Sequence, residues 1–107
     1  MLAGVWTPHA NFAGPDGLVT SEIVWAALDC PGWYAWLVRE AHSAGLVGTM
    51  TGEVVRCPRV GEPHIVMAWP IEGGTGRKRY CGVAMFTADG ECLARGRQVW
   101  IAFPTPA

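Results

Sequence analysis

The chain has 107 residues, half of them hydrophobic and 16% charged, which is enough apolar material for the core of one small domain. The formal net charge of −1, with no basic stripe along the chain, argues against binding to nucleic acid or to an acidic membrane surface. The most apolar run, residues 23–38, is too short to cross a membrane and contains both Asp29 and a Pro31-Gly32 break.

The first part of the chain predicts a strand, a loop and a helix. Val5 to Thr7 is typical of the end of a strand, which Pro8 closes. Residues 11–17 are dense in turn-forming residues and predict a loop. Thr20 then suits the N-cap of a helix that begins at Ser21.

The predicted helix is apolar nearly all round, which indicates burial rather than a place on the surface. Pro31 has no N–H and clashes with the carbonyl four residues earlier, so we expect a kink or break near Cys30. Helical structure is expected to resume through Tyr34 and to continue to about Ala41, with Gly45 ending it.

The rest of the chain predicts four strands joined by turns. Asp89-Gly90 is a strong hairpin signal, because these residues tolerate the positive φ angles of a tight turn. One buried helix followed by an antiparallel meander predicts an α+β domain with its sheet wrapped around the helix. The strands are expected at Val47–Arg56, His64–Ile71, Arg79–Thr87 and Cys92–Phe103.

The cysteines and the first residues bear on the compartment. Cys30, Cys57, Cys81 and Cys92 are scattered, with no C-x-x-C spacing among them. The N-terminal residues lack the basic start and the long apolar stretch of a signal peptide. We therefore expect reduced and mostly buried thiols in a cytoplasmic protein.

Six tryptophans are many large apolar side chains for a chain of 107 residues to bury. A small monomer buries a limited share of its surface, so we expect a second copy to cover some of these side chains. The composition therefore predicts self-association.

Asp29 is the candidate catalytic residue. It interrupts the apolar run, and no cationic residue follows it before Arg39. A carboxylate is rarely buried without a partner, and such burial is common where chemistry needs a carboxylate in a dry place. A second interpretation stays open, in which Asp29 accepts N–H groups freed around Pro31 and caps the second half of the broken helix.

Arg77, Lys78 and Arg79 form the one basic cluster of the sequence. Guanidinium and ammonium groups suit phosphate binding, although an ordinary solvated turn explains the same residues. Residues 73–78 do not have the spacing of a P-loop, and a strand rather than a helix is expected to follow them.

The histidines and Cys30 give weaker signals. His9, His42 and His64 are far apart and lack metal-ligand spacing, so we expect structural or surface roles and no metal site. Cys30 adjoins Asp29, whose negative charge opposes thiolate formation, so we interpret Cys30 as a packing residue.

The order of elements, together with residues 24–33 (VWAALDCPGW) and 87–100 (TADGECLARGRQVW), resembles the hot-dog acyl-CoA thioesterases. The resemblance extends from Trp6 to Phe103 and implies one domain over residues 1–107, with an antiparallel sheet wrapped around a central helix. Because related proteins usually carry at least one more strand before the helix, it also implies an N-terminally short member.

This resemblance assigns roles to individual residues. Asp29 matches the helix carboxylate that acts as nucleophile or as general base for water. Val19-Thr20-Ser21 stands where the phenylacetyl-CoA type of hot-dog thioesterase has His-Gly-Gly, so the backbone N–H of Ser21 would hold the oxyanion. Arg77, Lys78 and Arg79 would bind the nucleotide end of coenzyme A.

The implied assembly is a homodimer or homotetramer with its active sites at the interface between subunits. The implied reaction is hydrolysis of an acyl-CoA to free acid and CoA, without a metal or redox cofactor. Two alternatives remain, a non-catalytic acyl- or CoA-binding module and a hot-dog enoyl hydratase or dehydratase. The latter usually needs an Asp/His pair, and no histidine lies near Asp29 in the sequence.

Overall fold

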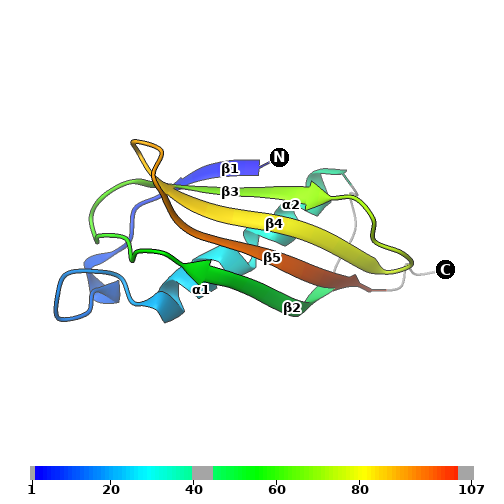
Figure 1. The fold of residues 1–107 in the computed structure, drawn as a ribbon, viewed down its shortest axis with the longest axis horizontal. Coiled ribbons are helices and arrows are strands. Elements are labelled where there is room, and N and C mark those ends of the chain that lie inside the picture. The colour runs from blue at the N-terminus through cyan, green and yellow to red at the C-terminus, as the bar shows by residue number, and fades with distance from the viewer. Residues whose placement is uncertain (1, 40–44, 104–107) are drawn as a thin grey trace.

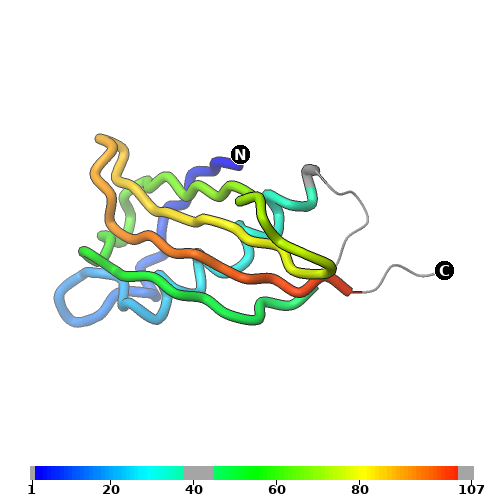
Figure 2. The backbone as a smooth tube through the Cα atoms, turned by 45° about the vertical axis from the view of Figure 1, so that its right-hand side comes forward, coloured from blue at the N-terminus to red at the C-terminus, as the bar shows by residue number. Residues whose placement is uncertain are grey.

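A computed structural model describes residues 2–39 and 45–103, and it shows an antiparallel sheet with a helix across one face (Figure 1). The five strands lie in the order β1-β3-β4-β5-β2, and the view in Figure 2 shows β1 and β2 at opposite edges. The elements are β1 (Leu2–Trp6), a 3₁₀ turn η1 (Ala10–Phe12), α1 (Ser21–Asp29), α2 (Pro31–Arg39), β2 (Gly45–Val54), β3 (His64–Ile71), β4 (Lys78–Thr87) and β5 (Cys92–Ala102).

The predicted α+β class and the order of elements are confirmed. Thr20 is the N-cap of α1, although its side chain makes no capping hydrogen bond. The predicted break is also present, since α1 ends at Asp29 and α2 begins at Pro31. Proline suits the first position of a helix because its missing N–H has no intrahelical partner there.

The prediction that Gly45 ends the helix is wrong, because Gly45 is the first residue of β2 and pairs with Ala102 on β5. A Cβ at this position would come within 2.6 Å of the carbonyl oxygen of Ile101, so glycine permits close approach of the strands. The expected helical residue Ala41 lies outside the described residues. One strand, β1, precedes the helix, and the expectation of an N-terminally short domain stays a prediction.

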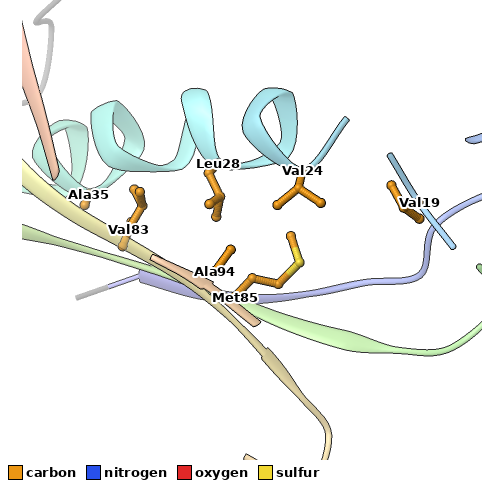
Figure 3. Packing of buried hydrophobic residues seen from close by; sticks show 8 residues of the cluster. Val19, Val24, Leu28, Ala35, Val83, Met85 and Ala94 are labelled. Carbon is orange, nitrogen blue, oxygen red and sulfur yellow. The ribbon is translucent and has the colours of Figure 1, made fainter. Parts of the chain in front are cut away.

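An aliphatic cluster lies between the helix and the sheet, mainly beneath α1. In Figure 3, Val24 and Leu28 point from the helix towards Met85 of β4 and Ala94 of β5. All four side chains are at most 2% exposed. The alternation of strand residues explains this arrangement, because every second side chain of β4 and β5 faces the helix. The buried members are Val19, Val24, Leu28, Ala35, Ala68, Val83, Met85 and Ala94.

An aromatic cluster lies beneath α2 and consists of Trp33, Trp36, Cys81, Trp100 and Ala102. The rings of Trp33 and Trp100 are 5.3 Å apart between centroids, with planes tilted by 30°. The indole N–H of Trp36 donates to the carbonyl of Tyr80 at 2.8 Å. This cluster therefore combines ring packing with directed hydrogen bonds.

The single chain hides more tryptophan than the composition suggested. Trp33, Trp36 and Trp100 are buried, two further tryptophans are half-buried, and Trp69 is 36% exposed. The tryptophan count thus does not by itself require a second copy, and self-association stays a prediction.

The expectation of mostly buried thiols is wrong. Cys81 is buried, but Cys57 and Cys92 are half-buried and Cys30 is exposed. Cys30 points away from the core because it lies about 200° around the helix axis from buried Leu28. The interpretation of Cys30 as a packing residue is therefore also wrong. None of the four thiols forms a disulfide with another.

Within the described residues, no helix is long and apolar enough to cross a lipid bilayer.

Candidate active site

Asp29 is the last residue of α1 and lies on the flank of the helix. Leu28 points into the core, and Asp29 is rotated from it by about 100°. Ala27 and Pro31 lie on the opposite flank, where they line an apolar groove of about 340 Å³ beside β1. Asp29 is therefore on the flank of the helix nearer to β2, one of the two edge strands of the sheet.

One oxygen of the Asp29 carboxylate, Oδ1, is buried and has no hydrogen-bond partner among the described residues. The capping interpretation required N–H groups around Pro31 to donate to this side chain, and no such bond is present in the described part of the chain. A buried carboxylate oxygen without a donor is costly, so this atom needs another explanation than helix capping.

The helix break is held from below by Gln98 of β5, which is completely buried. The backbone N–H of Trp33 donates to the carbonyl of Cys30 at 3.0 Å, one residue short of its regular helical partner Asp29. The Gln98 side-chain amide instead donates to the Asp29 carbonyl at 2.8 Å and to the Leu28 carbonyl at 3.1 Å. The Gln98 side chain thus supplies the hydrogen bonds that the Leu28 and Asp29 carbonyls would accept from backbone N–H groups in an unbroken helix.

Gly32 and Cys81 complete the contact between the break and the sheet. A Cβ on Gly32 would come within 2.0 Å of the Gln98 side-chain oxygen, so only glycine fits without displacement. The Cys81 thiol donates to the carbonyl of Gly32 at 3.2 Å. Burial raises the pKa of Cys81 from 9.0 to about 12, against a smaller lowering contribution from Trp36, so this thiol stays protonated and structural.

Ser21 begins α1, at the opposite end of the helix from Asp29. Eight residues at 1.5 Å per residue place the two about 12 Å apart along the axis. Ser21 is exposed, and its backbone N–H makes no hydrogen bond with any described residue. Within one chain, this donor and the Asp29 carboxylate are therefore too far apart to act on the same carbonyl carbon.

The basic turn precedes and begins β4, at the end of the sheet beneath α2. Arg79 lies with its guanidinium 5.8 Å from the ring centroid of Trp36, and its Nη1 donates to the carbonyls of Gly76 and Lys78 at 2.8 and 3.1 Å. Arg77 and Lys78 are exposed. The cluster is therefore split, because Arg79 is used within its own turn while Arg77 and Lys78 project from the surface.

The histidines lie away from Asp29. His9 accepts a hydrogen bond from the Asn11 backbone at 3.0 Å, and His42 lies outside the described residues. His64 is buried and pairs with Thr87, six residues along β4 from Cys81, or about 20 Å from the helix break. Among the described residues, no group of three His, Cys, Asp or Glu side chains is placed to hold a metal ion.

Sequence reasoning missed Gln98, whose side-chain amide donates to the Leu28 and Asp29 carbonyls at the break. The signal was available, since alternation along β5 places Gln98 on the same face as Ala94, Trp100 and Ala102. A lone amide on an otherwise apolar face indicates a buried hydrogen-bonding role. The pattern of the strand does not predict its partners, because the Leu28 and Asp29 carbonyls lie about 70 residues away in sequence.

Several solved structures similar to this chain are described as thioesterase superfamily proteins. A protein described as a thioesterase superfamily protein matches with a TM-score of 0.80 and 21% identity, over 92% of this chain and 47% of that one. A Bacillus halodurans protein solved with CoA matches with a TM-score of 0.80 and 14% identity, over 92% of this chain and 69% of that one. A Streptococcus mutans protein bound to acetyl-CoA matches with a TM-score of 0.82 and 6% identity, over 99% of this chain and 83% of that one.

These comparisons confirm the expected hot-dog fold, which the chain shares with solved structures described as thioesterase superfamily proteins. No protein-family model and no curated protein matches the sequence. The chain spans about half the length of the first protein described above, and the identities are low, so the activity of these proteins does not transfer with the fold.

Proposed function

We propose that this protein hydrolyses an acyl-CoA thioester, with Asp29 activating water or attacking the thioester carbonyl. The observation that carries the proposal is the buried Oδ1 of Asp29, which lacks a partner in the described chain and lies on a helix in a thioesterase-superfamily fold. Two similar structures hold CoA or acetyl-CoA, which supports a CoA thioester as the ligand.

The chemistry follows from what each group offers. The Asp29 carboxylate takes a proton from water, and the resulting hydroxide adds to the thioester carbonyl. A backbone N–H at the start of a helix, such as that of Ser21, stabilises the oxyanion. Collapse of this intermediate expels the CoA thiolate, which leaves a free acid. Arg77 and Lys78 are exposed and bind the CoA phosphates. The proposed reaction uses no metal or redox cofactor.

The proposed site consists of residues from two copies of the chain. Because Ser21 and Asp29 are about 12 Å apart within one chain, the oxyanion donor and the base come from different subunits of a homodimer or homotetramer. The open β2 edge beside Asp29 is the side on which a second copy would approach. Free thiols, including exposed Cys30, suit the reducing environment of the cytoplasm, which we propose as the compartment.

Thiol release from a panel of acyl-CoA substrates tests the proposal, with Ellman's reagent as the probe in a Cys30→Ser background that removes the exposed thiol. We expect Asp29→Ala to lower kcat by about 10² to 10⁴. Its free energy of unfolding should stay the same or rise by about 1 kcal/mol, because a buried oxygen without a donor is removed.

Glu53→Gln is the matched control, since Glu53 is an exposed carboxylate paired with Arg95 on β5. Its turnover should equal that of the parent protein. If the parent and Asp29→Ala bind acyl-CoA equally and neither releases thiol, the protein is a non-catalytic acyl- or CoA-binding module. The enoyl hydratase alternative has less support, because His64 is about 20 Å from the break.

Mixing two inactive variants tests the shared site. Ser21→Pro removes the N–H donor at the first helical position, where proline is tolerated and where Thr20 already has an extended backbone. When Ser21→Pro and Asp29→Ala subunits are mixed, we expect activity to reappear, because each mixed dimer has one site with both groups intact. No recovery in a confirmed mixed dimer would contradict the two-chain site.

A further inference from the structure

We infer that Gln98 is a positioning residue of the candidate site, because its buried amide fixes the backbone from which the Asp29 carboxylate projects. The inference rests on the proposed function for the role of Asp29. Gln98 itself has no route to a substrate, since it is 0% exposed and lies under the helix.

Every hydrogen-bonding group of the Gln98 amide is used. Nε2 donates to the carbonyls of Leu28 and Asp29 and lies 3.5 Å from the sulfur of Met50. Oε1 accepts from the indole N–H of Trp100 at 2.8 Å. A fully satisfied buried amide is directional, so it holds the helix at one rotation and one height above the sheet.

The orientation of Asp29 depends on this support from Gln98. Its buried Oδ1 makes no hydrogen bond with the described residues, so no bond to that atom sets the direction of the carboxylate. The helix is weakest at this point, because Pro31 lacks an N–H and Trp33 donates to Cys30 instead of Asp29. The Gln98 amide is therefore the group that fixes the Asp29 peptide.

The contact between Gln98 and the helix break leaves little room for adjustment. The Gly32 backbone lies so close to the Gln98 oxygen that a Cβ would collide with it, and Cys81 bonds the Gly32 carbonyl from the neighbouring strand. Loss of the amide donors would leave two buried carbonyls unpaired and allow the break to shift. A displacement of about 1 Å at a catalytic group lowers turnover by up to about 100-fold.

Gln98→Met tests the inference, because methionine has a similar length and no N–H donor. We expect kcat for acyl-CoA hydrolysis to fall about 10- to 100-fold with KM unchanged. Trp100→Phe keeps the Nε2 donors, removes the indole N–H that orients the amide and reduces the packing against Trp33, so it should give a smaller loss of kcat. Leu93→Ala is the control for stability alone, since Leu93 is buried on β5 but lies about 17 Å along the strand from Gln98.

A second measurement does not depend on activity. In Gln98→Met, hydrogen exchange at the Trp33 and Tyr34 amides, which both bond to Cys30, should speed up by about tenfold or more, and Leu93→Ala should leave it unchanged. The ¹³C signal of the Asp29 carboxyl should shift in Gln98→Met alone.

The two measurements separate the possible failures. Unchanged exchange and an unchanged Asp29 signal in Gln98→Met overturn the inference. Faster exchange with kcat equal to that of Leu93→Ala also overturns it, because Gln98 would then be purely structural. If the parent protein releases no thiol from any acyl-CoA, the proposed function fails, and the exchange and ¹³C measurements still decide whether Gln98 positions Asp29.

Discussion

The aliphatic cluster beneath α1 and the aromatic cluster beneath α2 are held together in different ways. The aliphatic cluster, with Val24, Leu28 and Met85, has only non-directional packing. The aromatic cluster joins ring packing to hydrogen bonds from Trp36 and Trp100. The helix break with Asp29 lies where the two meet. We therefore expect the aliphatic cluster to supply mainly stability, and the aromatic cluster and Gln98 to set the orientation of the break.

Met85→Ala is the most direct way to weaken the aliphatic cluster, and it should have the largest effect on stability. Met85 is completely buried, so its truncation leaves a cavity and should lower the free energy of unfolding by about 2–5 kcal/mol. Urea denaturation followed by tryptophan fluorescence measures this loss. Thiol release per folded molecule should stay unchanged, and a parallel fall in kcat would contradict the division of roles between the clusters.

Gly32→Ala perturbs the contact of the helix break with Gln98 and the aromatic cluster. The added Cβ collides with the Gln98 amide and approaches Cys81, so we expect a loss of about 1–3 kcal/mol in unfolding free energy. The fall in kcat should nevertheless exceed that of Met85→Ala. Gly90→Ala, at a hairpin glycine with φ of 93° far from the break, is a control for strain without a change at Asp29. An active but destabilised Gly32→Ala protein would contradict the proposed rigidity of the break.

Cys81 gives the aromatic cluster a dependence on pH that has no effect at neutral pH, where the thiol is protonated in both the folded and the unfolded chain. Because burial raises its pKa from 9.0 to about 12, the unfolded chain loses this proton first as pH rises above 9. The folded state then binds more protons than the unfolded state, so stability falls between pH 9 and 12, by at most about 1.4 kcal/mol per pH unit.

Urea denaturation at a series of alkaline pH values measures this slope. Cys81→Ser keeps a donor for the Gly32 carbonyl and removes the titrating thiol, so the difference between the two slopes isolates Cys81. Cys30→Ser, which replaces an exposed thiol instead of the buried one, is the matched control for the substitution of a cysteine by serine. Equal slopes for the parent and Cys81→Ser would show that the buried thiol does not contribute.

The sequence by itself determined the elements and their order. Local chemistry was sufficient, since Thr20 begins the helix, Pro31 breaks it, and alternating apolar residues with Asp89-Gly90 define the last two strands. The position of a carboxylate, Asp29, within an apolar run also indicated a candidate catalytic residue. Gly45 was misassigned because glycine suits both a helix end and a close approach of strands, and only the neighbouring strand distinguishes them.

The tertiary structure alone decided how the candidate residues are arranged. Packing of α1 and α2 on the sheet turned Asp29 towards the β2 edge, and it placed Gln98 beneath the break although the two residues are 69 positions apart. It also separated Arg79, which bonds to its own turn, from exposed Arg77 and Lys78. Local patterns specify backbone conformation, whereas contacts between distant residues depend on how whole elements pack, which no short stretch of sequence contains.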